Sequence, residues 1–121
     1  MSAWKIETPE VQAVLTTVQT NADTLGKALT EEKFTAIGNG IIWGSVLTEE
    51  VSKAVNQVMT EQGEKLRVIQ NHIGAGSAGV ANATIAYNNG QLDMAATFQS
   101  EAVKAADTGN FQYFADHGYQ G

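Results

Sequence analysis

The segment that decides the fold is residues 48–88, TEEVSKAVNQVMTEQGEKLRVIQNHIGAGSAGVANATIAYN. Apolar or small residues recur in it at alternating steps of three and four, which keeps them on one narrow face of a helix. This ladder consists of Val51, Val55, Val58, Gln62, Leu66, Ile69, Ile73, Gly76, Val80, Ala83 and Tyr87. We therefore predict one helix about 60 Å long, at about 1.5 Å per residue, which is longer than a compact domain of this size needs.

A helix of that length needs a second helix beside it, and the N-terminal third of the chain supplies one. Thr8, Pro9 and Glu10 form a helix start, with a hydroxyl cap, a proline and an acid in the first turn. A second apolar stripe follows at Val11, Val14, Leu15, Val18, Ala22, Leu25 and Leu29. The sequence thus predicts an antiparallel helical hairpin. In it, the seam of the long helix packs against the first helix through Val51, Val55, Val58, Leu66, Ile69 and Ile73.

The stripe of the first helix changes phase near Thr30, where Thr30, Glu31 and Glu32 provide a new helix cap. We predict a kink or short break there, and then a helical segment that reaches about Ile42. Glycines and an asparagine between residues 38 and 44 weaken helix, so the chain is expected to turn over between residues 38 and 47.

The C-terminal part of the chain predicts a shorter helix and a tail. Asn88, Asn89 and Gly90 form a stop signal, since asparagine and glycine tolerate the left-handed conformation. A weak amphipathic stripe then runs from residue 92 to about residue 107. We expect an all-α protein with one hairpin domain over residues 1–110 and an aromatic, glycine-containing tail over residues 111–121. The tail is either docked on the helices or a recognition segment. The short helix would complete a three-helix monomer, or a second protomer would complete a four-helix bundle.

Composition excludes several classes of function. The chain has 121 residues, no cysteine and a net charge of −6, which rules out disulfides and disfavours binding to nucleic acid or anionic lipid. No apolar run is long enough to span a membrane, and no basic segment followed by an apolar stretch marks a cleavable signal peptide. We therefore expect no membrane span and no export by the general secretory route.

Candidate catalytic and cofactor sites have simpler explanations. Residues 74–79, GAGSAG, match a dinucleotide-binding pattern with Asp93 downstream, but the residues before them belong to the helical ladder rather than to a strand. Small residues that let two helices, or a helix and a bound segment, approach closely are the preferred interpretation. His72 and His117 lack metal-ligand spacing. We predict no enzyme activity, no cofactor and no metal.

Trp43, Gly44 and Ser45 lie between the two halves of the hairpin. A long helix, this tryptophan and glycine at mid-chain, and a capped second helix that ends near Tyr87 resemble the WXG family of small helical hairpins of type VII secretion systems. The family's turn motif is tryptophan, any residue, glycine, so the glycine here stands one place early. Residues 4–6 and residues 86–95, AYNNGQLDMA, are also similar to uncharacterised relatives of that family.

The resemblance implies an export signal, partners and a localisation. The family's signal is a tyrosine followed four places later by an acid; here Tyr87 is followed by Gln91 at that place and by Asp93 two residues further on. The implied partners are a homodimer or heterodimer with another helical hairpin, a larger secreted effector and the secretion ATPase. The protein would be secreted without a cleavable signal peptide, and cytoplasmic before export. The alternative is a cytosolic helical adaptor or chaperone-like module that is not exported.

Overall fold

A computed structural model describes residues 6–41 and 49–119, and within these ranges every regular element is a helix. The elements are α1 (Thr8–Ala28), α2 (Glu31–Ile41), α3 (Glu49–Asn88), α4 (Leu92–Thr108) and α5 (Gln112–His117). The predicted all-α class is confirmed. The predicted turn motif, Trp43, Gly44 and Ser45, lies outside the described residues.

The N-terminal arm of the hairpin consists of two helices, α1 and α2, with a break where the sequence predicts it. The carbonyl of Glu7 accepts the first backbone hydrogen bonds of α1, and Pro9 stands in the first turn, where its missing N–H costs nothing. The amide of Leu29 donates to the carbonyls of Leu25 and Gly26 and so closes α1, while the carbonyl of Thr30 starts α2. The change of stripe phase is therefore accommodated by two residues between the helices.

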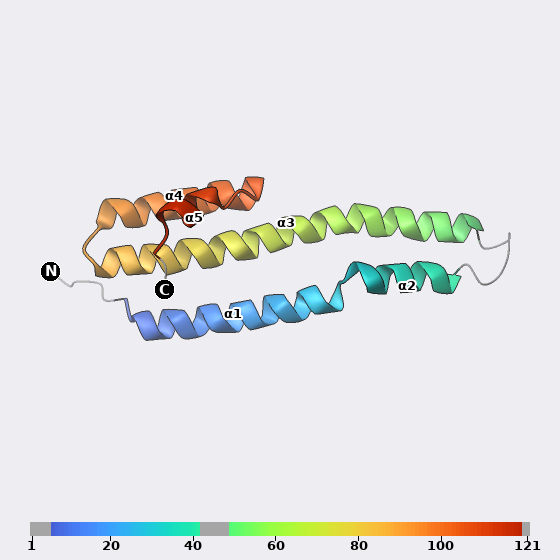
Figure 1. Cartoon of the computed structure of the whole chain (residues 1–121), viewed down its shortest axis with the longest axis horizontal. Helices are drawn as coiled ribbons and strands as arrows, with labels where there is room; N and C mark the ends of the chain where they lie inside the picture. Colours follow the sequence, from blue (N-terminus) through green and yellow to red (C-terminus); the bar gives the residue numbers. More distant parts are fainter. Residues whose placement is uncertain (1–5, 42–48, 120–121) are drawn as a thin grey trace.

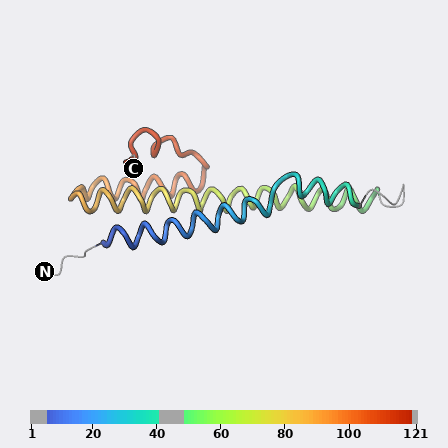
Figure 2. The backbone as a smooth tube through the Cα atoms, turned by 60° about the horizontal axis from the view of Figure 1, so that its bottom comes forward, coloured from blue at the N-terminus to red at the C-terminus, as the bar shows by residue number. Residues whose placement is uncertain are grey.

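The long helix lies at the centre of the molecule. Figure 1 shows α1 and α2 along one side of α3, and α4 along the other side of its C-terminal half. Figure 2 confirms from a second direction that α1 and α2 follow α3 in the opposite chain direction. Residues of α1 at steps of four, three and four are partly buried on this contact: Val11, Leu15, Val18 and Ala22. The antiparallel hairpin is thus present, with a shorter C-terminal helix added to it.

The connection between α3 and α4 is a tight turn. Gly90 has φ 75°, a left-handed conformation that favours glycine, and the amide of Gln91 donates to the carbonyl of Ala86 at 2.9 Å. The two helices then approach closely, because Gly79 faces Ala102 and a methyl group at Gly79 would collide with the Ala102 side chain. This closeness explains why α4 lies flat against α3.

The core lies between α3 and α4 and is made mostly of small side chains. Its buried apolar residues are Ala75, Ala83, Ala86, Ala95, Phe98 and Ala105. Phe98 is the largest fully buried side chain among the described residues. The buried apolar side chains of the described residues therefore gather at one end of the rod, and the contact of α3 with α1 and α2 is made by partly buried residues.

The described part of the C-terminal tail, residues 111–119, is docked. It forms α5 and places three aromatic rings around Phe98, with centroid separations of 5.9 Å to Tyr113, 6.0 Å to Phe114 and 5.9 Å to Tyr119. The sequence leaves open whether the tail is docked on the helices or is a recognition segment. In the structure its described part is docked.

Candidate functional site

The seam predicted on α3 divides into two groups of residues. Val55, Leu66 and Ile73 are partly buried. Val51, Val58 and Ile69 remain 55%, 57% and 46% exposed, so the hairpin does not enclose them. The physical reason is geometric: a stripe with steps of three and four is wider than the line along which one neighbouring helix makes contact.

The exposed members of the seam continue along the helix. At about 100° per residue, Val51, Val58, Ile69 and Val80 lie within about 40° of one another around the axis of α3. Val80 is 48% exposed. We name these four residues the exposed stripe. It extends for more than half of the length of α3, and the described residues leave its side chains about half exposed.

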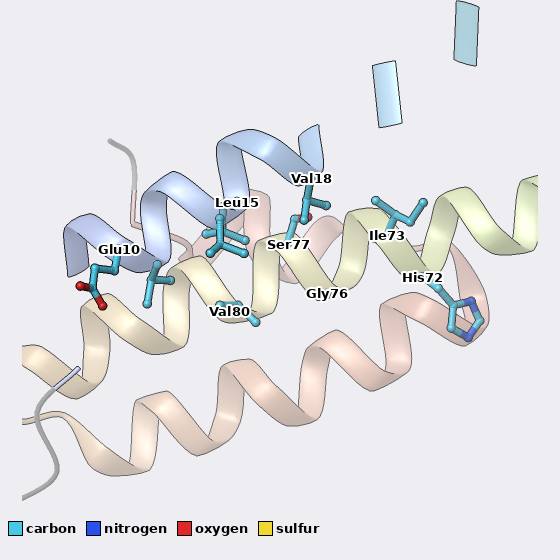
Figure 3. Close-up of a pocket in the computed structure, with 10 residues that line it drawn as sticks. Glu10, Leu15, Val18, His72, Ile73, Gly76, Ser77 and Val80 are labelled. Atoms are coloured by element: carbon cyan, nitrogen blue, oxygen red, sulfur yellow. The ribbon is translucent and has the colours of Figure 1, made fainter. Parts of the chain in front are cut away.

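The exposed stripe leads into an apolar groove between α1 and α3. The groove has a volume of about 550 Å³ and is lined on the α1 side by Val11, Val14, Leu15 and Val18. Its α3 side includes Ile73, Gly76 and Val80. In Figure 3, Leu15 and Val18 lie between the two helices near Ser77. Val14, at the groove, is 62% exposed, so this side of the groove is open.

The GAGSAG segment lies inside α3, and its three glycines have different neighbours. Gly74 meets the ring of Phe111 from the tail, at 3.2 Å from the place of a Cβ, and Gly79 meets Ala102 of α4. A Cβ added at Gly76 would meet nothing within 4 Å outside its own helix, and Gly76 lines the groove. The segment is therefore helical from end to end, and two of its glycines serve the close approach of other parts of the chain.

The predicted export-signal residues lie at the turn between α3 and α4. Tyr87 is in the last turn of α3 and packs against the buried cluster around Phe98. Gln91 is the N-cap of α4, and Asp93 stands exposed in the first turn of α4. We name Tyr87, Gln91 and Asp93 the signal corner. A polar contact fixes it, because the Tyr119 hydroxyl of the tail donates to Gln91 Oε1.

Two further residues hold this end of the molecule together. The side chain of Asn82 is buried; its amide donates to the carbonyl of Ala78 at 2.9 Å, and its Oδ1 accepts the backbone N–H of Tyr119 at 2.7 Å. The amide of Asn88 donates to Thr8 Oγ1, which ties the end of α3 to the start of α1.

The charged side chains form pairs within single helices. Lys53 bonds to Glu49 at 3.0 Å, and Arg67 pairs with Glu64 one turn away. The hydrogen bond from Arg67, together with its charge, lowers the pKa of the Glu64 carboxyl. Both side chains are exposed, so this pair supports the local helix and does not form a site.

Sequence reasoning missed the importance of Phe98, Asn82 and Tyr119. Phe98 stands in a weak, alanine-rich stripe, and Asn82 is a polar residue in a helix interior, where periodicity gives no reason to expect burial. The sequence does contain one indication of these contacts, since it combines a glycine-rich helix with an aromatic tail. Glycine exposes the helix backbone, and aromatic rings can pack on it.

Within the described ranges, no helix is long and apolar enough to cross a membrane, and no three His, Asp or Glu side chains gather in a group that would hold a metal ion. No curated protein and no solved structure matches the chain. A family model, DUF6507, described as a family of unknown function, matches residues 1–113. Because this match covers most of the sequence, the chain belongs to the DUF6507 family of unknown function.

Proposed function

We propose that this chain is a non-enzymatic, WXG-like helical protein of a type VII secretion system. It acts by association, either as a secreted substrate or as the targeting partner of a larger secreted protein. The observation that carries the proposal is an antiparallel hairpin whose 40-residue helix α3 keeps a half-exposed apolar stripe. A protein with this shape gains stability when a second elongated helical surface covers the stripe.

The exposed stripe supports pairing with another helical hairpin, as homodimer or heterodimer. Full burial of a valine or isoleucine is worth about 1.5–3 kcal/mol, so covering a half-exposed side chain is worth about 1 kcal/mol. Four such residues, together with Val14 at the groove, supply several kcal/mol towards association. The paired hairpins would form a four-helix bundle.

Light scattering tests this pairing. The purified protein is measured alone and mixed with a helical-hairpin protein that is encoded by a neighbouring gene. We expect Val58→Glu to weaken association by at least ten-fold, since it removes apolar area and brings an unpaired carboxylate into the interface. Val103→Glu is the matched control, because Val103 is 65% exposed on α4 and lies away from the stripe. Equal effects of the two substitutions would contradict the proposed surface.

The signal corner supports the secretion part of the proposal. Tyr87, Gln91 and Asp93 lie together at one end of the rod, where the secretion ATPase would read them. In a host with an active type VII system, Tyr87→Ala is expected to reduce export strongly, while Asn89→Ala, an exposed neighbour in the same turn, is expected to leave it unchanged. Export of Tyr87→Ala at the wild-type level would reject the signal assignment.

One observation favours a second candidate function, a cytosolic helical adaptor that is not exported. Gln91 stands where the family's signal has an acid, and its side-chain oxygen is already bonded to Tyr119. An amide with an intramolecular partner is a weaker recognition element than a free carboxylate. Fractionation of cells that carry an active type VII system separates the two candidates, because the adaptor stays entirely in the cytosol.

A further inference from the structure

We infer that the C-terminal segment, residues 109–119, is an autoinhibitory cover over the signal corner, and that it lifts as a unit before the corner is read. This inference rests on the proposed function, because it concerns regulation of the same corner. The cover is held at its two ends, fills an apolar surface with its middle, and makes few backbone contacts with the other helices.

The two ends of the cover are fixed by different chemistry. At its start, Gly109 has φ 71° and sits against the Asn71 side chain, and the Phe111 ring lies over the bare backbone of Gly74. At its end, both polar groups of Tyr119 are engaged: its backbone N–H donates to Asn82, and its hydroxyl donates to Gln91. The C-terminal attachment therefore includes a residue of the signal corner itself.

The middle of the cover seals an apolar surface. Tyr113, Phe114 and Tyr119 pack around the fully buried ring of Phe98, in the same cluster against which Tyr87 packs. When the cover is closed, Tyr87 is half-buried against this cluster, and the Gln91 side chain, although exposed, has its Oε1 occupied by the Tyr119 hydroxyl; Asp93 is exposed. Opening would free Gln91 Oε1 and present the aromatic surface beside Tyr87 at the same time.

The cover is attached to the rest of the fold through a limited set of contacts, although its opening exposes the Phe98 ring. The helix α5 has six residues and is held mainly through side chains, with few close backbone contacts to α3 or α4. Its ring contacts are with α4 and within the tail itself, so the pairing of α1 and α2 with α3 does not depend on it. Short segments held in this way open locally at a much smaller cost than global unfolding.

The hydroxyl of Tyr119 provides a minimal way to test the cover. Tyr119→Phe removes the hydrogen bond to Gln91 and keeps the ring on Phe98. Tyr113→Phe is the matched control, since it makes the same chemical change in the same tail without touching the signal corner. The variants are compared in the full-length protein by hydrogen exchange and by export from a host with an active type VII system.

We expect Tyr119→Phe to speed amide exchange across residues 112–119 about three- to ten-fold, the effect of one hydrogen bond, and to raise the exported fraction by a similar factor. Tyr113→Phe should change neither. If the amides of Tyr119→Phe exchange at the wild-type rate, the proposed cover is rejected, whether or not the protein is exported. Faster exchange without greater export, in a host where Tyr87→Ala blocks export, overturns the inhibitory role alone. If Tyr87→Ala is exported at the wild-type level, the proposed signal and the inhibitory role are both rejected. The exchange rates of residues 112–119 still show in that case whether the cover opens.

Discussion

Replacement of Phe98 by alanine is expected to lower the free energy of unfolding by about 3–5 kcal/mol, the range for large-to-small changes at a closed site. Phe98 is 0% exposed and has three rings of the tail about it at centroid distances of 5.9–6.0 Å. Its other neighbours in the buried cluster are Ala83, Ala86 and Ala95. Because these alanines are too short to fill the space, the cavity left by the ring should persist.

Thermal and urea unfolding, followed by circular dichroism, measure this loss. An unfolding entropy of about 2.1 cal/mol/K per residue gives about 0.25 kcal/mol/K for a chain of this length, so each kcal/mol lowers Tm by about 4 °C. The expected fall for Phe98→Ala is therefore about 12–20 °C. Phe98→Leu, which keeps most of the apolar volume and loses only the ring pairs, should lose about 2 kcal/mol.

The matched control is Val103→Ala, on the same helix and 65% exposed, for which a change below about 0.5 kcal/mol is expected. If Phe98→Ala lost no more than this control, the aromatic cluster would not be the core of the protein. A Phe98→Leu variant as stable as the wild type would show that the ring pairs contribute nothing beyond apolar volume.

Four further substitutions test the packing of the helices, the turn into α4 and the docking of the tail. Gly79→Val should cost about 1–3 kcal/mol of unfolding free energy, since the valine side chain collides with Ala102. Gly76→Ala should instead raise Tm slightly, because the space beside Gly76 is open and alanine favours helix. Thermal melts compare the two variants. Gly90→Ala should cost about 1–2 kcal/mol, measured in urea, because φ at this residue is 75°. Asn82→Ala should cost about 1–3 kcal/mol and should speed exchange of the Tyr119 amide, since the buried hydrogen-bond acceptor is lost.

The helices themselves were predictable because their signals are local. The ladder in residues 48–88 predicts α3, which the structure bounds at Glu49–Asn88. The cap at Thr30 predicts the break between α1 and α2, and Asn89 with Gly90 predicts the turn into α4. Each of these features depends on residues within one or two turns of each other, so neighbouring side chains and backbone preferences decide them.

The faces that meet were not predictable in the same way. The sequence assigns Val51, Val58 and Ile69 to the hairpin seam, but the structure leaves them about half exposed, since α1 and α2 cover only one edge of the stripe. In the same way, nothing within residues 111–121 tells whether their aromatic rings are free or docked. That outcome depends on Gly74, Asn82 and Phe98, which lie elsewhere in the chain.

The sequence alone therefore determined an all-helical chain, the approximate bounds of the four longer helices and an apolar surface larger than one hairpin can bury; it did not predict α5 in the tail. Only the tertiary structure decided that the core lies between α3 and α4 with the tail rings packed on it, and that Tyr119 binds the signal corner through Gln91. The physical reason is that helix periodicity is set by residues one turn apart. Burial, in contrast, depends on contacts between residues far apart in the sequence. The small residues of α3 allow close approach by any helix or ring, so they do not by themselves specify which segment packs there.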